Sequence, residues 1–105
     1  MSTKVSKLPL TGIKVIEVGQ LLAGPFAGTL LAYFGADVIK VEPPKTGDPI
    51  RKWRLLDEQG TSFWWYSLGR NKRYVTANLR DRSGRTLLKT LISEADVLIE
   101  NFKPG

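Results

Sequence analysis

The sequence predicts an α/β protein whose parallel sheet is built from two strand-helix-strand units. Four short runs rich in β-branched residues have the length of strands, at residues 13–18, 36–42, 74–79 and 96–100. Stretches with helical spacing of apolar residues lie between the first two runs and between the last two. Strands joined by a helix usually pair in parallel through a right-handed crossover, so this order favours a parallel sheet.

The first unit is marked by glycine and proline. The strand over residues 13–18 ends at Gly19. Pro25 is expected to begin a helix that continues over residues 26–34, because a proline at the first helical position loses no hydrogen bond. This helix is apolar almost all round, so we expect it to be buried on more than one side. Gly35 fits a C-terminal cap before the second strand.

The middle of the chain is less regular. Residues 43–61 are predicted to form an irregular loop, and residues 62–68 a short helix that buries aromatic side chains. Asp81 or Ser83 can cap the helix of the second unit. Apolar residues recur along that helix at helical spacing, namely Leu87, Leu88, Leu91 and Ile92.

Length and composition limit the possible chemistry. The 105 residues suffice for one domain, with a flexible segment expected over residues 1–9 and the folded part over residues 10–105. The chain has no cysteine, which excludes disulfides, thiolate metal sites and a cysteine nucleophile. It has no histidine either, so the commonest general base is absent. We therefore expect no metal. No apolar run is long enough to span a bilayer and the first residues do not resemble a secretion signal, so we expect a cytoplasmic protein without a membrane partner.

Positive charge is unevenly distributed along the chain. The net charge is +6, and nine of the sixteen Lys and Arg lie between Arg51 and Arg85. A basic surface attracts nucleic acid, anionic lipid or a phosphorylated cofactor, although a solvated face without a partner has the same composition. The aromatic residues 63–66, beside Arg70, could stack on nucleic-acid bases. Four clustered aromatic residues are more typical of a core or an interface.

The predicted sheet indicates where a site would lie. Ligands of open parallel sheets bind outside the carboxyl ends of the strands, here the loops 19–25, 42–48, 79–81 and 101–105. The glycines of the first loop match neither a dinucleotide fingerprint nor a P-loop, and close packing explains them about as well. Five carboxylates on or beside strands form no acid/base pair and are expected in ion pairs or turns, namely Glu17, Asp37, Glu42, Asp96 and Glu100.

Five segments of the chain match a known pattern in order and without a large gap. They are Leu10 to Glu17, Ala23 to Ala27, Phe34 to Pro44 with Gly47-Asp48-Pro49 following, Arg70 to Arg73, and Ala95 to Gly105. Together they resemble the N-terminal part of class III CoA-transferases, the formyl-CoA transferase/carnitine dehydratase-like (CaiB/BaiF) family. Each segment alone is only weakly specific for the family. Their joint occurrence from Leu8 onward makes the resemblance specific.

The resemblance implies an incomplete Rossmann-like domain, part of a chain several times longer, two copies of which form an interlocked homodimer. The implied reaction moves coenzyme A from an acyl-CoA donor, with succinyl-CoA among the candidates, to a small carboxylic acid. An aspartate attacks the thioester to give a mixed anhydride and then an enzyme-bound thioester, which splits one hard exchange into easier steps. That aspartate is expected beyond Gly105, so no catalytic residue is assigned and the 105 residues alone are expected to be inactive.

The resemblance also implies which residues contact coenzyme A, which acts as a substrate with no tightly bound cofactor. Leu22 and Ala23 would lie beside the thiol end, and Arg80 would contact phosphate. The remaining positions carried over are Ala77, Asn78 and Leu79 at the end of the third strand, and Asn101, Phe102 and Lys103 along the pantetheine and nucleotide path. These residues lie in three of the four loops that sheet geometry selects independently.

Two positions depart from formyl-CoA transferases, which carry glutamine in place of Leu22 and arginine in place of Pro43. These departures count against formyl or oxalyl substrates and leave the succinyl-CoA-dependent and carnitine-type branches open. Other functions remain as alternatives: an acyl-CoA racemase of the same superfamily, with its acid/base residues also beyond Gly105, or a non-catalytic module that binds coenzyme A or a partner. A basic nucleic-acid binder is the alternative that we expect least, so no nucleic-acid partner is assigned.

Overall fold

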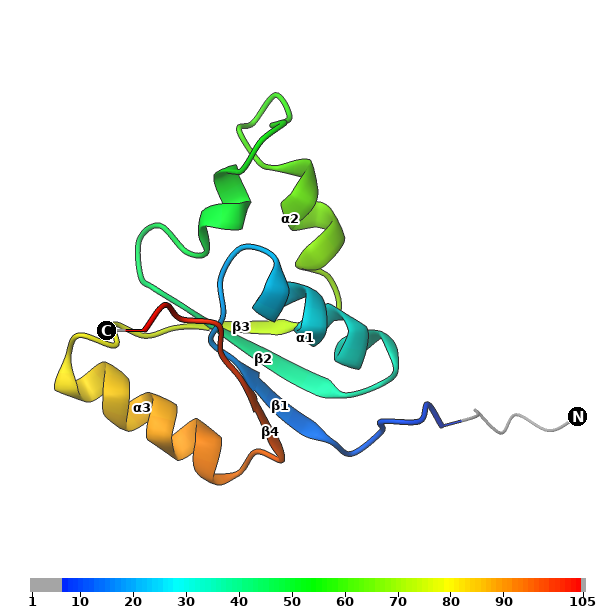
Figure 1. Ribbon diagram of the computed structural model, residues 1–105, viewed down its shortest axis with the longest axis vertical. Helices are drawn as coiled ribbons and strands as arrows, with labels where there is room; N and C mark the ends of the chain where they lie inside the picture. Colours follow the sequence, from blue (N-terminus) through cyan, green and yellow to red (C-terminus); the bar gives the residue numbers. More distant parts are fainter. Residues whose placement is uncertain (1–6, 105) are drawn as a thin grey trace, which may run out of the picture.

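The computed structural model describes residues 7–104, in which four parallel strands form one sheet in the order β3-β2-β1-β4 (Figure 1). The strands are β1 Lys14–Glu17, β2 Asp37–Glu42, β3 Arg73–Thr76 and β4 Val97–Ile99. The predicted parallel α/β sheet is confirmed. The second unit does not join neighbouring strands, because β3 and β4 lie at opposite edges of the sheet. The direction in which strands are added therefore reverses beside β1, between β1 and β4.

Helices cover both faces of the sheet (Figure 1). On one face, Ala32 of the helix α1 (Ala23–Tyr33) packs with Val15 and Val38. On the other face, the helix α3 (Arg82–Ser93) contributes three partly buried side chains to a core around Ile16 and Val41, namely Leu88, Leu91 and Ile92. Alternate strand residues thus face opposite helices, as the period of two requires.

The helix α1 departs from its prediction at its start and in its burial. It begins at Ala23, so Pro25 is its third residue, still within the first turn where backbone N–H groups lack intrahelical partners. Only one side of α1 is buried among the described residues. The other side exposes Phe26 by 53%, Leu30 by 45% and Tyr33 by 62%, so the expected burial on several sides is wrong for residues 7–104. The apolar sequence gives the helix two apolar faces, and this sheet covers one of them.

Residues 43–72 form a long connecting segment between β2 and β3 that projects away from the sheet (Figure 1). The predicted irregular loop contains a 3-10 helix, η1 (Pro49–Lys52), because Asp48 caps it and Pro49 has the φ that a first helical residue needs. The predicted short helix is present as α2 (Phe63–Leu68), capped by Ser62. It docks on α1 through Thr29, whose hydroxyl donates to the Leu68 carbonyl at 2.6 Å.

The aromatic side chains of α2 are less buried than predicted. Phe63, Trp64 and Tyr66 are 56%, 41% and 51% exposed, because α2 is short and only its Leu68 end reaches the core. Other boundaries differ by a few residues. The third strand ends at Thr76 and not at residue 79, and α3 begins after Asp81, whose side chain makes no capping hydrogen bond.

Two predictions are not tested by this fold. Of the segment 1–9 predicted to be flexible, residues 1–6 lie outside the described residues, and the division of the chain at residue 10 stays a prediction. Among the helices of residues 7–104, none has the length and apolarity needed to traverse a bilayer. The cytoplasmic location likewise stays a prediction.

Candidate functional site

A hollow of about 570 Å³ lies at the carboxyl edge of the sheet. It is lined by residues at or after the ends of all four strands, a position at which open α/β sheets bind ligands. Its volume falls within the range of ligand sites. We call it the main hollow; its lining residues are Val18, Gln20, Val41, Glu42, Pro43, Pro44, Lys45, Ala77, Asn78, Leu79, Arg80 and Phe102.

A second hollow, of about 440 Å³, adjoins the first and shares Gln20 and Phe102 with it. This side hollow lies between the loop after β1 and the segment after β4, where the order of strands reverses. Crevices at such reversals are the usual ligand positions of open parallel sheets. The side hollow is lined by Gln20, Leu21, Leu22, Trp53, Asn101, Phe102 and Lys103. Together the two hollows offer room for an elongated ligand.

Within residues 7–104, the charged side chains of the two linings that have no ion-pair partner are all positive. Lys45, Arg80 and Lys103 are exposed there. Glu42, the acidic residue among these lining residues, forms an ion pair with Arg51. The guanidinium donates from Nε to Oε2 and from a terminal nitrogen to Oε1, both at 2.7 Å. Burial would raise the pKa of Glu42, but the Arg51 guanidinium and the Asp48 N–H together hold it below its ordinary value. Of the described lining residues, an anionic ligand therefore meets cations at the rim and no free carboxylate.

Asn101 holds the loop after β1 at the junction of the two hollows. The Gln20 N–H donates to Asn101 Oδ1 at 2.8 Å, and Asn101 Nδ2 donates to the Gln20 carbonyl at 3.0 Å. A Cβ on Gly24 would lie 2.9 Å from the Gly19 Cα, and a Cβ on Gly19 would collide with Asn101. Close packing therefore accounts for these glycines, in agreement with that interpretation of the sequence.

A buried ion cluster lies under the same loop, formed by Glu17, Lys40, Asp48 and Lys72. Lys40 Nζ lies 2.6 Å from Glu17 Oε2 and 2.8 Å from Asp48 Oδ2, and Lys72 Nζ lies 2.7 Å from Glu17 Oε1. All four side chains are at most 1% exposed. Burial lowers the pKa of Lys72, an effect that Glu17 partly offsets. The cluster is electrically balanced, as buried charges must be to persist.

Eight of the nine residues predicted to contact coenzyme A line the two hollows. Ala77, Asn78, Leu79 and Arg80 line the main hollow, Leu22, Asn101 and Lys103 line the side hollow, and Phe102 lies in both. The ninth, Ala23, begins α1 and is not among the lining residues. Gln20 and Lys45 were not singled out from the sequence, although both fall within loops that sheet geometry selected. Trp53 was missed, because its loop showed no pattern that brings it to the sheet edge.

Two predictions about charged residues have clear outcomes. Four of the five carboxylates expected in ion pairs or turn bonds have such partners: Glu17 with Lys40 and Lys72, Asp37 with Arg73, Glu42 with Arg51, and Glu100 with the Phe102 N–H. Asp96 differs, because it accepts the Lys14 N–H, 82 positions away at the start of β1. The predicted basic surface is smaller than expected. The Lys72 side chain is fully buried against Glu17, and the Arg73 guanidinium is paired with Asp37.

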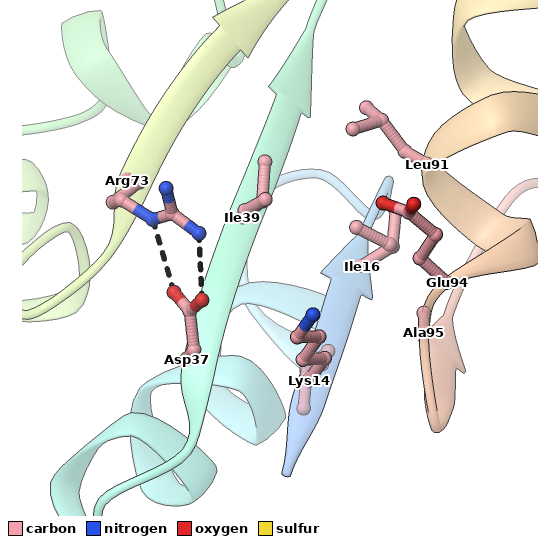
Figure 2. Close-up of a pocket in the computed structure, with 9 residues that line it drawn as sticks. Lys14, Ile16, Asp37, Ile39, Arg73, Leu91, Glu94 and Ala95 are labelled. Atoms are coloured by element: carbon pink, nitrogen blue, oxygen red, sulfur yellow. Dashed lines mark hydrogen bonds and ion pairs between the residues drawn. The ribbon is translucent and has the colours of Figure 1, made fainter. Parts of the chain in front are cut away.

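The opposite, amino edge of the sheet carries a smaller pocket of about 130 Å³ (Figure 2). It lies among the starts of β1, β2 and β3 and the end of α3. Arg73 donates there to Asp37 from two nitrogens, at 3.0 and 2.6 Å, so its charge is already satisfied. The pocket is lined by two basic residues, Lys14 and Arg73, and by two acidic residues, Asp37 and Glu94, so its charges cancel. Its size and balanced charge make it a poorer anion site than the carboxyl edge.

A parallel sheet covered by helices on both faces, with hollows at its carboxyl edge, places the chain in the class of Rossmann-like α/β proteins. Within that class, the sequence profile of CoA-transferase family III matches residues 10–105, and the chain belongs to this family. The resemblance inferred from the sequence motifs is thereby confirmed.

Curated and solved relatives agree with this assignment. The chain is 49% identical over 105 residues to succinyl-CoA–D-citramalate CoA-transferase of Chloroflexus aurantiacus, covering 100% of this chain and 26% of that one. It is 40% identical over 97 residues to the succinyl-CoA:glutarate CoA-transferase of Homo sapiens, covering 92% and 22%. The crystal structure of a CaiB/BaiF family protein from Brucella suis matches with a TM-score of 0.83 and 44% identity, over 93% and 27% of the two chains. The chain thus spans about a quarter of the length of these relatives.

Proposed function

We propose that these residues form the coenzyme A-binding part of an enzyme that transfers coenzyme A from an acyl-CoA donor to a small carboxylic acid. The observation that carries the proposal is the pair of adjoining hollows at the carboxyl edge, lined from all four strand ends and bordered by cations that have no ion-pair partner among residues 7–104. Membership of the transferase family supports the same reaction.

The two hollows suit the two ends of coenzyme A. Its nucleotide end carries phosphates, which need cations such as Arg80 and Lys45 at the rim of the main hollow. Its pantetheine arm is long and only weakly polar, and the thiol at its tip would reach Leu21 and Leu22 in the side hollow. Phe102, which is common to both linings, would lie along the arm. Pro43 cannot supply the contact that arginine makes in formyl-CoA transferases, and Lys45 is the nearby cation in the same lining.

For the substrates we propose succinyl-CoA as the donor and a dicarboxylic acid as the acceptor, because the two enzymes named above combine succinyl-CoA with D-citramalate or glutarate. The residues described here would bind the nucleotide and direct the thioester toward the side hollow. An aspartate outside these residues would attack the thioester carbonyl and release the coenzyme A thiolate. The thiolate would then attack the aspartyl carbonyl of this first anhydride, which releases succinate and leaves an enzyme-bound thioester. The acceptor carboxylate would displace the thiolate from that thioester and form a second anhydride. Attack of the thiolate on the acceptor carbonyl of this anhydride would give the new acyl-CoA and return the aspartate carboxylate.

The test is binding and transfer by the full natural chain. Calorimetry with coenzyme A should show binding that weakens roughly tenfold or more in Arg80→Ala, since a charge-assisted phosphate contact is lost. The matched control is Arg82→Ala, because Arg82 is also exposed but lies outside both linings. Formation of a new acyl-CoA from succinyl-CoA and the free acid would complete the test, and a chain that binds no coenzyme A would overturn the proposal.

The same experiments distinguish the alternatives. A racemase would exchange the α-proton of an acyl-CoA with solvent deuterium and form no new thioester. A binding module would bind coenzyme A without turnover. A nucleic-acid binder would lose affinity steeply with salt through counterion release, whereas one coenzyme A molecule should show a shallower dependence.

We also propose that the full natural chain forms an interlocked homodimer. The exposed apolar faces of α1 and α2 support this proposal, because Phe26, Leu30, Tyr33, Phe63 and Trp64 are each at least 41% exposed. Soluble proteins rarely leave adjacent large apolar side chains uncovered. Light scattering of the full natural chain should give twice the monomer mass at all dilutions, and a stable monomer would contradict the proposal.

A further inference from the structure

The loop after β1 contains a strained residue held by a buried carboxylate. We propose that Asp48 is a positioning residue of the coenzyme A site: it fixes the left-handed backbone of Leu21 and thereby shapes the side hollow. The inference rests on the proposed function, since the side hollow is where the thiol end of coenzyme A would lie. Asp48 is 27 positions from Leu21 and is not itself a lining residue of either hollow.

Leu21 has a φ of 62°, in the left-handed region that bulky L-residues seldom adopt. Such a conformation persists only where the surroundings impose it. Here the Leu21 N–H donates to Asp48 Oδ1 at 3.0 Å. The preceding residue, Gln20, is held on both its N–H and its carbonyl by Asn101. Two side chains from distant parts of the sequence therefore fix two successive residues of this loop.

Asp48 is itself fixed on every side. Its carboxylate is 1% exposed, its Oδ2 lies 2.8 Å from Lys40 Nζ, and its Oδ1 also accepts the Ile50 N–H at 3.0 Å. Its own N–H donates to Glu42 Oε2 at 2.7 Å. The carboxylate cannot rotate away without breaking several of these contacts. It is therefore a rigid acceptor, and rigid support of this kind keeps a binding loop in its bound geometry before the ligand arrives.

The consequence for the ligand follows from the next residue along the chain. Leu22 lines the side hollow and also precedes the first residue of α1. If Leu21 returned to a common φ, the chain direction at Leu22 would change and the lining would move. Loss of the Asp48 acceptor should therefore weaken the binding of coenzyme A, because part of the binding free energy would be spent on ordering the loop.

A matched pair of variants isolates this effect from the charge of the cluster. Removing Asp48 alone would leave Lys40 without one of its two anionic partners. Lys40→Met combined with Asp48→Asn or with Asp48→Ala removes one charge of each sign and leaves the Lys72–Glu17 pair intact. The asparagine variant retains an oxygen that can accept the Leu21 N–H, and the alanine variant does not.

Leu21→Asn, introduced into both double variants, completes the design. Asparagine tolerates the left-handed region, so it needs less support from residue 48. Asp48 also caps η1 through the Ile50 N–H, and a change at position 21 should not compensate for the loss of that cap. Compensation by Leu21→Asn therefore reports on the loop and not on η1.

The measurements use the full natural chain, with hydrogen exchange of the peptide containing residues 20–22 and titration with coenzyme A. We expect the alanine variant to exchange faster there and to bind coenzyme A roughly 5- to 30-fold more weakly than the asparagine variant, as expected for one lost backbone hydrogen bond and released strain. Leu21→Asn should shrink that ratio several-fold.

Equal affinity of the two double variants would overturn the inference, as would a ratio that Leu21→Asn leaves unchanged. A wild-type chain that binds no coenzyme A would instead overturn the proposed function, and the role of Asp48 with it. The wild-type titration therefore separates the two failures.

Discussion

Gln20 and Asn101 lie 81 positions apart and are joined by two hydrogen bonds, at 2.8 and 3.0 Å, that satisfy both backbone groups of Gln20. One residue follows β1 and the other follows β4, so the pair closes the sheet at the point where the order of strands reverses. Asn101 was expected to contact the ligand. In the structure its amide holds the loop, and the residue also lines the side hollow.

Asn101→Ala should therefore loosen the loop after β1 and reduce the free energy of unfolding. Two hydrogen bonds are lost, each worth about 0.5–1.5 kcal/mol, and the exposure of Asn101 favours the lower end of that range. Urea unfolding of the full natural chain gives the change in free energy. Gln59→Ala is the control, because Gln59 is an exposed amide in the loop between η1 and α2. An Asn101→Ala variant as stable as the control would contradict this assignment.

The fold could be predicted from the sequence where the pattern is local. The runs of β-branched residues at 13–18 and 36–42 and the helical spacing after Asp81 identify elements that the structure contains. The edge position of β4 could not be predicted, because no local signal states which neighbour a strand chooses. The 3-10 helix η1 was missed, since residues 43–61 were predicted to be an irregular loop and the cap of η1 is a single side chain.

The site was predictable to a similar extent and for a similar reason. Strand ends identify the loops of a parallel sheet, so Arg80 and Phe102 were expected near a ligand and do line the main hollow. The buried ion cluster was not predicted. Lys72 and Lys40 have ordinary sequence contexts, and only the folded chain shows that Glu17 and Asp48 are close enough to compensate their buried charges. Trp53 is likewise brought to the side hollow by tertiary packing.

Gly28→Ala should destabilise the chain even though alanine is the better helix former. A Cβ at position 28 would lie 3.0 Å from Glu17 Cδ and 3.4 Å from Lys72 Nζ, and closer still to Glu17 Oε1. Alanine gains about 1 kcal/mol of helix propensity, but overpacking against a rigid buried pair costs about 1–3 kcal/mol. Thermal unfolding measures the balance, with the exposed Lys89→Ala as the control. A raised melting temperature in Gly28→Ala would show that the cluster can move aside.

Tyr74 should ionise at a higher pH than an ordinary tyrosine. Burial, followed by the negative charge of Glu42, raises its pKa from 10.0 to about 12. Because the folded pKa exceeds the unfolded one, its contribution to stability is complete below pH 10 and is lost as the pH approaches 12. Tyrosinate absorbance should show a late transition that Tyr74→Phe removes and Tyr33→Phe retains, with circular dichroism confirming that the chain is folded. A wild-type curve that matches Tyr74→Phe in shape would exclude this shift.

The ion pair between Glu42 and Arg51 should make the free energy of unfolding depend on pH in the acidic range. Burial would raise the pKa of Glu42, but the Arg51 guanidinium and the Asp48 N–H lower it from its ordinary value of 4.5. A lowered folded pKa means that the contribution is present above pH 4.5 and is lost as the pH falls through the folded pKa. At pH 7, Glu42→Gln should cost about 1–2 kcal/mol, the low end for charged hydrogen bonds because Arg51 is 36% exposed.

The pH dependence of that cost distinguishes the charge of Glu42 from its shape. Wild type and Glu42→Gln differ at position 42 alone, so the difference between their free energies of unfolding isolates that side chain. Urea unfolding from pH 7 down to pH 3 should show this difference shrinking below pH 4.5. Glu58→Gln, at an exposed carboxylate, is the control and should change stability little at any pH. A difference that stays constant with pH would mean that the Arg51 pair acts through packing, with its guanidinium 3.7 Å from the ring centre of Trp65 as the contact that matters.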